Sequence, residues 1–100
     1  MFNTKFEDLF KIKIRKEEDK IEKIHMDIAA SIQKFTEDFV ITNSEFAIKL
    51  TNLNNLCLAG GVALNCVANS KIVEHFKGNV KLWIQPASGD AGTSLGSALY

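Results

Sequence analysis

The chain has 100 residues, which is enough for one small domain. Hydrophobic residues make up 46% of it and charged residues 24%, a composition too apolar for a disordered chain. Twelve basic residues balance twelve acidic ones, and this zero net charge argues against a nucleic-acid binder or a membrane-surface binder. The N-terminal residues lack the apolar core of a signal peptide, and no stretch is long and apolar enough to span a membrane. We therefore expect a cytoplasmic protein.

Charge is distributed unevenly along the chain. Residues 1–24 hold thirteen of the 24 charges, residues 50–70 hold none, and Asp90 is the one charge among residues 82–100. Exposed surfaces usually carry interspersed charge, so the second half is expected to be buried or to line a site.

The first half predicts one strand, a connector and a long helix. Residues 10–15 alternate apolar and basic side chains, which is typical of a half-buried strand and would make it an edge strand. The charge-dense residues 16–23 favour a connector over a helical turn. A helix is expected from an N-cap at Asp27 to Leu50, because apolar residues recur along one face at helical spacing: Ile28, Ile32, Phe35, Phe39, Phe46 and Leu50.

The second half predicts a β-α-β-α unit. A short apolar strand over residues 56–59 precedes a helix over residues 62–76, and residues 77–79 end that helix with a left-handed glycine. A second strand over residues 81–84 leads into a helix capped by Thr93 or Ser94. The two strands should be parallel, with a right-handed crossover.

Glycine loops follow both predicted strands and precede both predicted helices. They contain Gly60 and Gly61 in the first loop, and Gly89 and Gly92 in the second. In a parallel sheet both loops lie at the carboxyl edge, where glycine lets an anion approach backbone N–H groups. Two helix N-termini would contribute roughly 4 kcal/mol, a dissociation constant near 1 mM for a phosphate or adenylate group.

Two polar residues near these loops have alternative interpretations. Asp90 is either a turn residue or a ligand for a divalent cation that bridges phosphates. Asn65 either reaches a ligand or caps a buried turn. The pattern alone weighs the alternatives equally in both cases.

Three ordered motifs, at residues 25–33, 56–70 and 85–92, resemble the O-carbamoyltransferases of nodulation and antibiotic tailoring. The resemblance covers residues 25–100 and implies a partial actin-like (ribonuclease H-like) α/β lobe, with a parallel β-α-β-α core after a long helix. Residues 1–24 match no part of it and form a separate charged segment.

The family resemblance implies ATP and carbamoyl phosphate as substrates, a carbamoyl-adenylate intermediate and transfer to a hydroxyl-bearing small molecule. It places Val62 and Asn65, with the four glycines, at the nucleotide site, and Asp90 at a divalent metal for which iron is one candidate. The family's other metal ligands are two histidines of an HxxxH element, which this sequence lacks. No catalytic residue is identified.

We expect this chain to be a fragment that is inactive alone, because a two-stranded parallel sheet needs more strands and helical cover. One alternative is a non-catalytic remnant or docking subunit, whose exposed sheet edge pairs with a complementary chain or with itself. Another is a protein like the tRNA threonylcarbamoyl-transfer enzymes, although the neutral charge favours no nucleic-acid partner. No membrane partner is expected.

Overall fold

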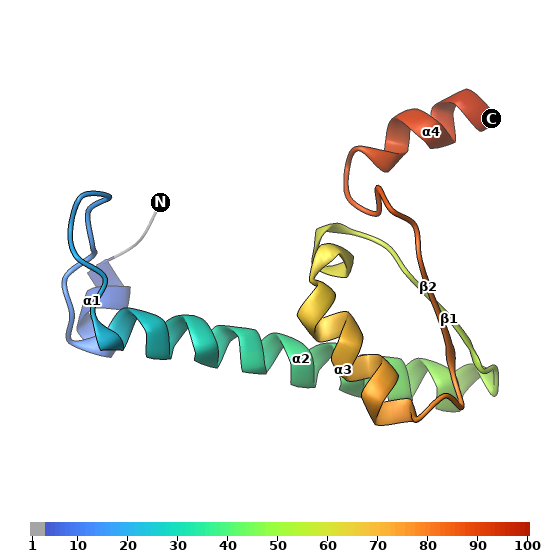
Figure 1. Ribbon diagram of the computed structural model, residues 1–100, viewed down its shortest axis with the longest axis horizontal. Helices are drawn as coiled ribbons and strands as arrows, with labels where there is room; N and C mark the ends of the chain where they lie inside the picture. Colours follow the sequence, from blue (N-terminus) through green and yellow to red (C-terminus); the bar gives the residue numbers. More distant parts are fainter. Residues whose placement is uncertain (1–3) are drawn as a thin grey trace. The chain divides into compact units, whose positions relative to one another are not determined.

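The computed structural model describes residues 4–100 (Figure 1). In chain order the elements are α1 (Thr4–Phe10), α2 (Lys23–Thr51), β1 (Asn55–Leu58), a 3₁₀ turn η1 (Gly61–Leu64), α3 (Cys66–Phe76), β2 (Lys81–Ile84) and α4 (Gly92–Leu99). The chain divides into two compact units, Met1–Ala30 and Ser31–Tyr100.

The predicted strand over residues 10–15 is wrong. Phe10 is the last residue of α1, where its ring lies 4.7 Å from that of Phe6, and Lys11 then turns the chain with a φ of 54°. The N–H of Ile14 donates to the Glu7 carboxylate at 2.8 Å rather than to a neighbouring strand. Alternation alone does not make a strand when no second strand pairs with it. Residues 1–3 of the predicted charged segment lie outside the described residues.

The connector predicted over residues 16–23 is confirmed as far as Glu22, but Lys23 already belongs to helix α2, which begins four residues before the predicted cap at Asp27. Glu22 precedes the helix, and its N–H donates to Nδ1 of His25 at 2.9 Å while its carbonyl accepts from the N–H of His25. The imidazole thus takes the place of the Glu or Gln side chain that accepts from the N-cap N–H in a capping box, whereas the His25 N–H is bound by the backbone carbonyl of Glu22 and not by its side chain. The His25 side chain therefore satisfies the backbone N–H of the residue before α2.

The rest of α2 is the long helix that the apolar spacing predicts. Polar side chains inside it turn back onto carbonyls one turn earlier, as Asn43 does to Phe39 and Ser44 to Val40, without interrupting the helix. Asn52, with a φ of 55°, ends it in the left-handed conformation that asparagine tolerates.

Strands β1 and β2 pair in parallel, as predicted, with Asn55 opposite Lys81 and Leu58 opposite Ile84. Helix α3 lies between them in sequence, and Figure 1 shows it crossing the C-terminal half of α2. An ion pair of 2.7 Å between His75 and Glu45 joins these two helices. Residues 31–100 are thus an α/β unit with a long helix and a two-stranded parallel sheet.

The predicted helix over residues 62–76 is interrupted. A 3₁₀ turn ends at Leu64, and α3 starts after Asn65, whose extended backbone (φ −75°, ψ 90°) separates the two. At the other end of α3, both Lys77 (φ 49°) and Gly78 (φ 80°) are left-handed, so the predicted glycine stop is confirmed and extended by one residue.

The prediction that the second half is buried or lines a site is wrong as to burial. Among the described residues, three apolar side chains are buried: Ala63, Ala68 and Ile72. Trp83 on β2 is 58% exposed, because this two-stranded sheet leaves its faces largely uncovered. Within residues 4–100, α2 is long enough to cross a bilayer but too polar to do so, and the shorter helices do not qualify either.

Candidate functional site

The two predicted glycine loops meet at the carboxyl ends of β1 and β2. The N–H of Gly60 donates to the carbonyl of Ser88 at 2.7 Å. A Cβ built on Gly89 would lie 3.9 Å from Cα of Gly61 and 3.5 Å from the Leu64 side chain. The structure therefore brings the first and second loops into contact, as the parallel pairing of the strands predicts.

The first loop exposes its backbone. Gly60 has a φ of 99°, a conformation that favours glycine. Gly61 lacks this constraint, and a Cβ there would have nothing within 4 Å. The space beside Gly61 is thus open to a ligand, and this glycine is dispensable for the fold of the loop itself.

The second loop is tighter, and its helix starts earlier than predicted. A Cβ on Gly92 would overlap the carbonyl oxygen of Ala87, so the loop requires glycine there. Helix α4 starts at Gly92, and the predicted caps lie inside its first turn. The hydroxyl of Thr93 donates to the carbonyl of Asp90 at 2.6 Å, and that of Ser94 to Ala91 at 2.8 Å. These hydroxyls bind carbonyls and leave the helix without a side-chain cap.

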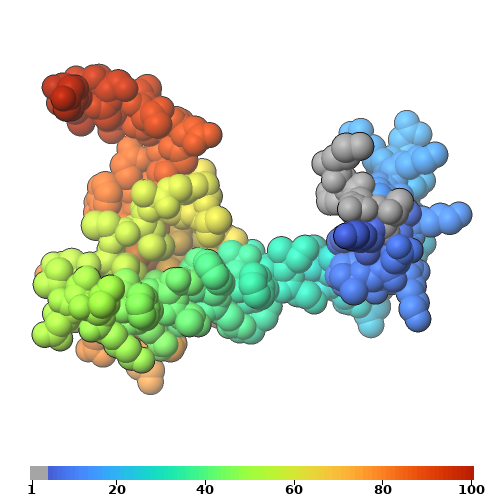
Figure 2. Space-filling view, turned by 180° about the vertical axis from the view of Figure 1, so that it is seen from behind, coloured from blue at the N-terminus to red at the C-terminus, as the bar shows by residue number. Residues whose placement is uncertain are grey.

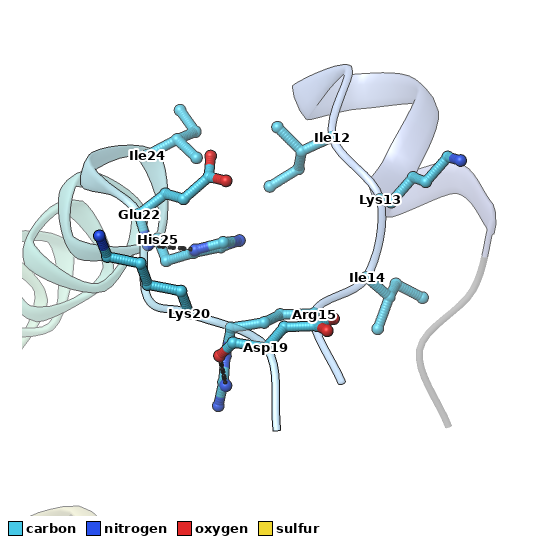
Figure 3. Close-up of a pocket in the computed structure, with 9 residues that line it drawn as sticks. All are labelled: Ile12, Lys13, Ile14, Arg15, Asp19, Lys20, Glu22, Ile24 and His25. Atoms are coloured by element: carbon cyan, nitrogen blue, oxygen red, sulfur yellow. Dashed lines mark hydrogen bonds between the residues drawn. The ribbon is translucent and has the colours of Figure 1, made fainter. Parts of the chain in front are cut away.

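A cavity of about 490 Å³ lies in residues 4–30, and Figure 3 shows its lining. The Arg15 guanidinium donates to the carbonyls of Glu17 and Asp19, at 2.9 and 2.6 Å. His25 accepts from Glu22 there. These polar groups fix the connector ahead of α2, and the cavity contains none of the predicted site residues.

A cavity of about 480 Å³ lies beside the second loop and contains Gly89 and Gly92 in its lining. Two polar residues of the loop also line it, Gln85 and Ser88, which the sequence analysis did not single out. Within the described residues, Oε1 of Gln85 and Oγ of Ser88 are buried without a hydrogen-bond partner. Only the folded loop reveals these unsatisfied groups, because loop polarity in a sequence does not show burial.

Asn65 is a structural cap and also a link between helices. Its Oδ1 accepts from the N–H of Ala68 at 3.1 Å, which caps α3. Its Nδ2 donates to Oε1 of Gln33 on α2 at 2.9 Å, and Nε2 of Gln33 lies 3.4 Å from Oδ1 of Asn65. Gln33, to which the sequence analysis assigned no role, thus joins the first motif to the glycine turn.

The side chains of Val62 and Asp90 take no part in the hydrogen bonds of Asn65. Val62 on η1 is exposed and lines a groove against α2. Asp90 is exposed in the second loop. No three His, Cys, Asp or Glu side chains among residues 4–100 cluster closely enough to hold a metal ion. The described residues therefore do not supply a complete ligand set for the implied metal site.

The pKa of Lys71 on α3 is raised by its hydrogen bond to Glu74, 2.8 Å away, and this pair is on the surface of the helix.

A family model described as the carbamoyltransferase N-terminus matches residues 1–99. The match includes residues 1–24, to which the resemblance in the sequence analysis did not extend. No solved structure matches the chain significantly.

Three relatives illustrate the range of similar proteins. Uncharacterized protein sll1178 of Synechocystis is 50% identical over 99 residues, which is 99% of this chain and 16% of the relative. Nodulation protein NolO of Bradyrhizobium diazoefficiens is 42% identical over 76 residues, 75% of this chain and 14% of the relative. The tRNA N6-adenosine threonylcarbamoyltransferase of Clostridium kluyveri is 40% identical over 77 residues, 74% of this chain and 23% of the relative. The chain thus spans less than a quarter of each relative's length.

Proposed function

This chain belongs to the carbamoyltransferase N-terminus family, and on that premise we propose that it forms the glycine-loop part of the nucleotide site of an ATP-dependent O-carbamoyltransferase. Water would cleave carbamoyl phosphate to carbamate and phosphate. A carbamate oxygen would then attack the α-phosphorus of ATP, the bond from that phosphorus to the pyrophosphate oxygen would break, and carbamoyl-adenylate and pyrophosphate would form. The oxygen of a hydroxyl-bearing small molecule would then attack the carbonyl carbon of the carbamoyl-adenylate, the bond from that carbon to the phosphate oxygen would break, and AMP would leave.

The contact between the two loops is the observation that carries this proposal. The hydrogen bond from Gly60 to Ser88 holds both loops at one edge of the sheet. The open space beside Gly61 lets a phosphate group come close to the backbone. In the second loop, the Ser88 hydroxyl has no partner among the described residues and is a donor of the kind that binds phosphate oxygens. Loop backbone N–H groups and this hydroxyl together suit an anionic ligand.

The chain alone binds such a ligand weakly. The first loop leads into a short 3₁₀ turn, and the side chain of Asn65 caps α3, so α4 is the one α-helix that begins directly after a glycine loop. One helix N-terminus contributes up to about 2 kcal/mol, which corresponds to a dissociation constant near ~30 mM. This is weaker than the value expected from two helices.

Asp90 is proposed as one metal ligand, on the family resemblance. Because the described residues hold no complete ligand set, no step of the reaction is assigned to a metal here. The remaining ligands would have to come from other parts of a longer carbamoyltransferase.

A ¹H–¹⁵N NMR titration of the chain with ATP and a divalent metal, to about 20 mM, tests the proposal. We expect localised shifts at residues 59–65 and 88–94. Gly61→Val should abolish them, because a branched side chain fills the open space while the fold is unaffected. Ser70→Val, at an exposed position on α3, is the control and should leave the shifts intact. Unchanged ATP shifts in folded Gly61→Val would remove the glycine turn from the site.

Threonylcarbamoyl transfer to tRNA is the second candidate, favoured by relatives such as the Clostridium kluyveri enzyme. The nodulation protein NolO and this relative align with almost the same share of the chain, 75% and 74%, so the preference for O-carbamoyl transfer rests on the family model, which matches residues 1–99. Fluorescence anisotropy with labelled tRNA distinguishes the two candidates. The balanced charge predicts no binding at physiological salt.

A further inference from the structure

One face of α2 carries a straight row of exposed apolar side chains, here called the α2 stripe. Its members recur at spacings of three, four or seven residues, which places them within about 60° of one another around the helix axis. They are largely uncovered, at 59, 70, 56, 65 and 73% exposure: Ile32, Phe35, Phe39, Phe46 and Leu50. Figure 2 shows the C-terminal half of α2 (green) open toward the viewer, in front of the rest of residues 31–100.

The α2 stripe continues into an apolar groove of about 290 Å³. Phe35 and Phe39 form its wall on α2, and Leu58 and Val62 contribute from β1 and η1. Seven of its nine lining residues are apolar. Stripe and groove together make a continuous uncharged surface, and surfaces of this kind mark sites of protein contact.

The spread of exposed apolar side chains indicates the kind of partner. An interface of standard size covers about 800 Å² on each partner. The exposed apolar side chains also lie on α3, β2 and α4, for example Val67, Trp83 and Leu95. A single contact with a second copy would leave most of this surface uncovered.

We propose that the α2 stripe and its groove bind another part of the carbamoyltransferase polypeptide, from outside the matched stretch. That part would pack on them through uncharged apolar side chains. The Synechocystis relative carries 84% of its length outside the match, which is ample to cover the exposed apolar side chains of α2, α3, β2 and α4. The inference rests on the family membership and not on the proposed nucleotide site.

The test places this chain inside the Synechocystis relative, in place of the 99 residues that it matches at 50% identity. In that chimera, Phe35→Gln and Phe46→Gln should each lower the melting temperature by about 5 °C or more, because a polar side chain replaces a buried ring. Lys34→Gln, at an exposed position about 130° around the helix axis from the centre of the stripe, should change it by about 1 °C or less. Equal melting temperatures for all three variants would overturn the proposal.

A second measurement adds the isolated chain to the Synechocystis relative from which the matched residues are deleted. Analytical ultracentrifugation should show a one-to-one complex, and the Phe35→Gln/Phe46→Gln double variant should weaken it at least tenfold. Dimers of the chain that do not bind the relative, and that the double variant dissociates, would assign the surface to a second copy and overturn the proposal. Neither measurement uses ATP. Both therefore test the docking proposal even if the nucleotide titration shows no binding.

Discussion

Gly92 is the glycine of the second loop at which the backbone leaves no room for a Cβ. The carbonyl of Ala87 occupies the place of its missing Cβ, and Oε1 of Gln85 lies 3.6 Å from that place. The turn that directs the second loop into α4 therefore depends on this one position. Gly96, one turn later in the same helix, has open space around it.

Gly92→Ala should destabilise the folded chain by about 1–3 kcal/mol, because backbone must move to admit the methyl group. Gly96→Ala is the matched control and should stabilise it by up to about 1 kcal/mol, since alanine favours helix. Urea unfolding followed by circular dichroism measures both. Similar midpoints for the two variants would show that the second loop yields easily.

Gln33 and Asn65 act as one unit between α2 and the glycine turn. Gln33→Ala should lower stability by about 1 kcal/mol, and Asn65→Ala by about 1–2 kcal/mol because it also removes the cap of α3. In a double-mutant cycle measured by urea unfolding, the two changes should couple by about 0.5–1.5 kcal/mol. Strict additivity would mean that the amide pair contributes nothing between the helices.

At the scale of the elements, the ends of helices α2 and α3 determine where strands β1 and β2 begin. Asn52 and Lys77 both adopt left-handed backbone and turn the chain into β1 and toward β2. Lysine at such a position is strained, because its Cβ crowds the following carbonyl. The sequence indicates the stop through Gly78, but the strained residue is the one before it.

Lys77→Gly should stabilise the chain by up to about 1 kcal/mol, by relieving the left-handed strain at the end of α3. Ser70→Gly, inside the same helix, should destabilise it by about 0.5 kcal/mol. Thermal unfolding of both variants against the parent chain checks the opposite signs. A Lys77→Gly variant that melts below the parent would contradict the assignment of strain.

At the scale of the whole molecule, an uncovered α/β unit holds part of a site. The loops meet, yet the described residues supply no complete metal-ligand set, and three buried apolar side chains make a small core. On the proposed function, the remaining parts of the site come from polypeptide outside the residues described.

Incubation of this chain with ATP, carbamoyl phosphate and a divalent metal should yield no carbamoyl-adenylate above a blank without protein. The reason is the weak anchoring of one helix N-terminus, together with the incomplete metal shell. Liquid chromatography with mass detection measures the product, and the full-length Synechocystis relative serves as the comparison. Product formed by the chain alone would show that it contains a working site.

The sequence by itself determined the family, the long helix, the two parallel strands and the meeting of the glycine loops. These follow from local signals: apolar spacing, glycine turns and the rule that parallel strands end at one edge. Tertiary structure alone decided that residues 10–15 form no strand and that Gln33 holds Asn65. Pairing and burial depend on residues far apart in sequence, so local patterns show neither the missing strand partner nor the exposure of the α2 stripe, although they do show its apolar spacing.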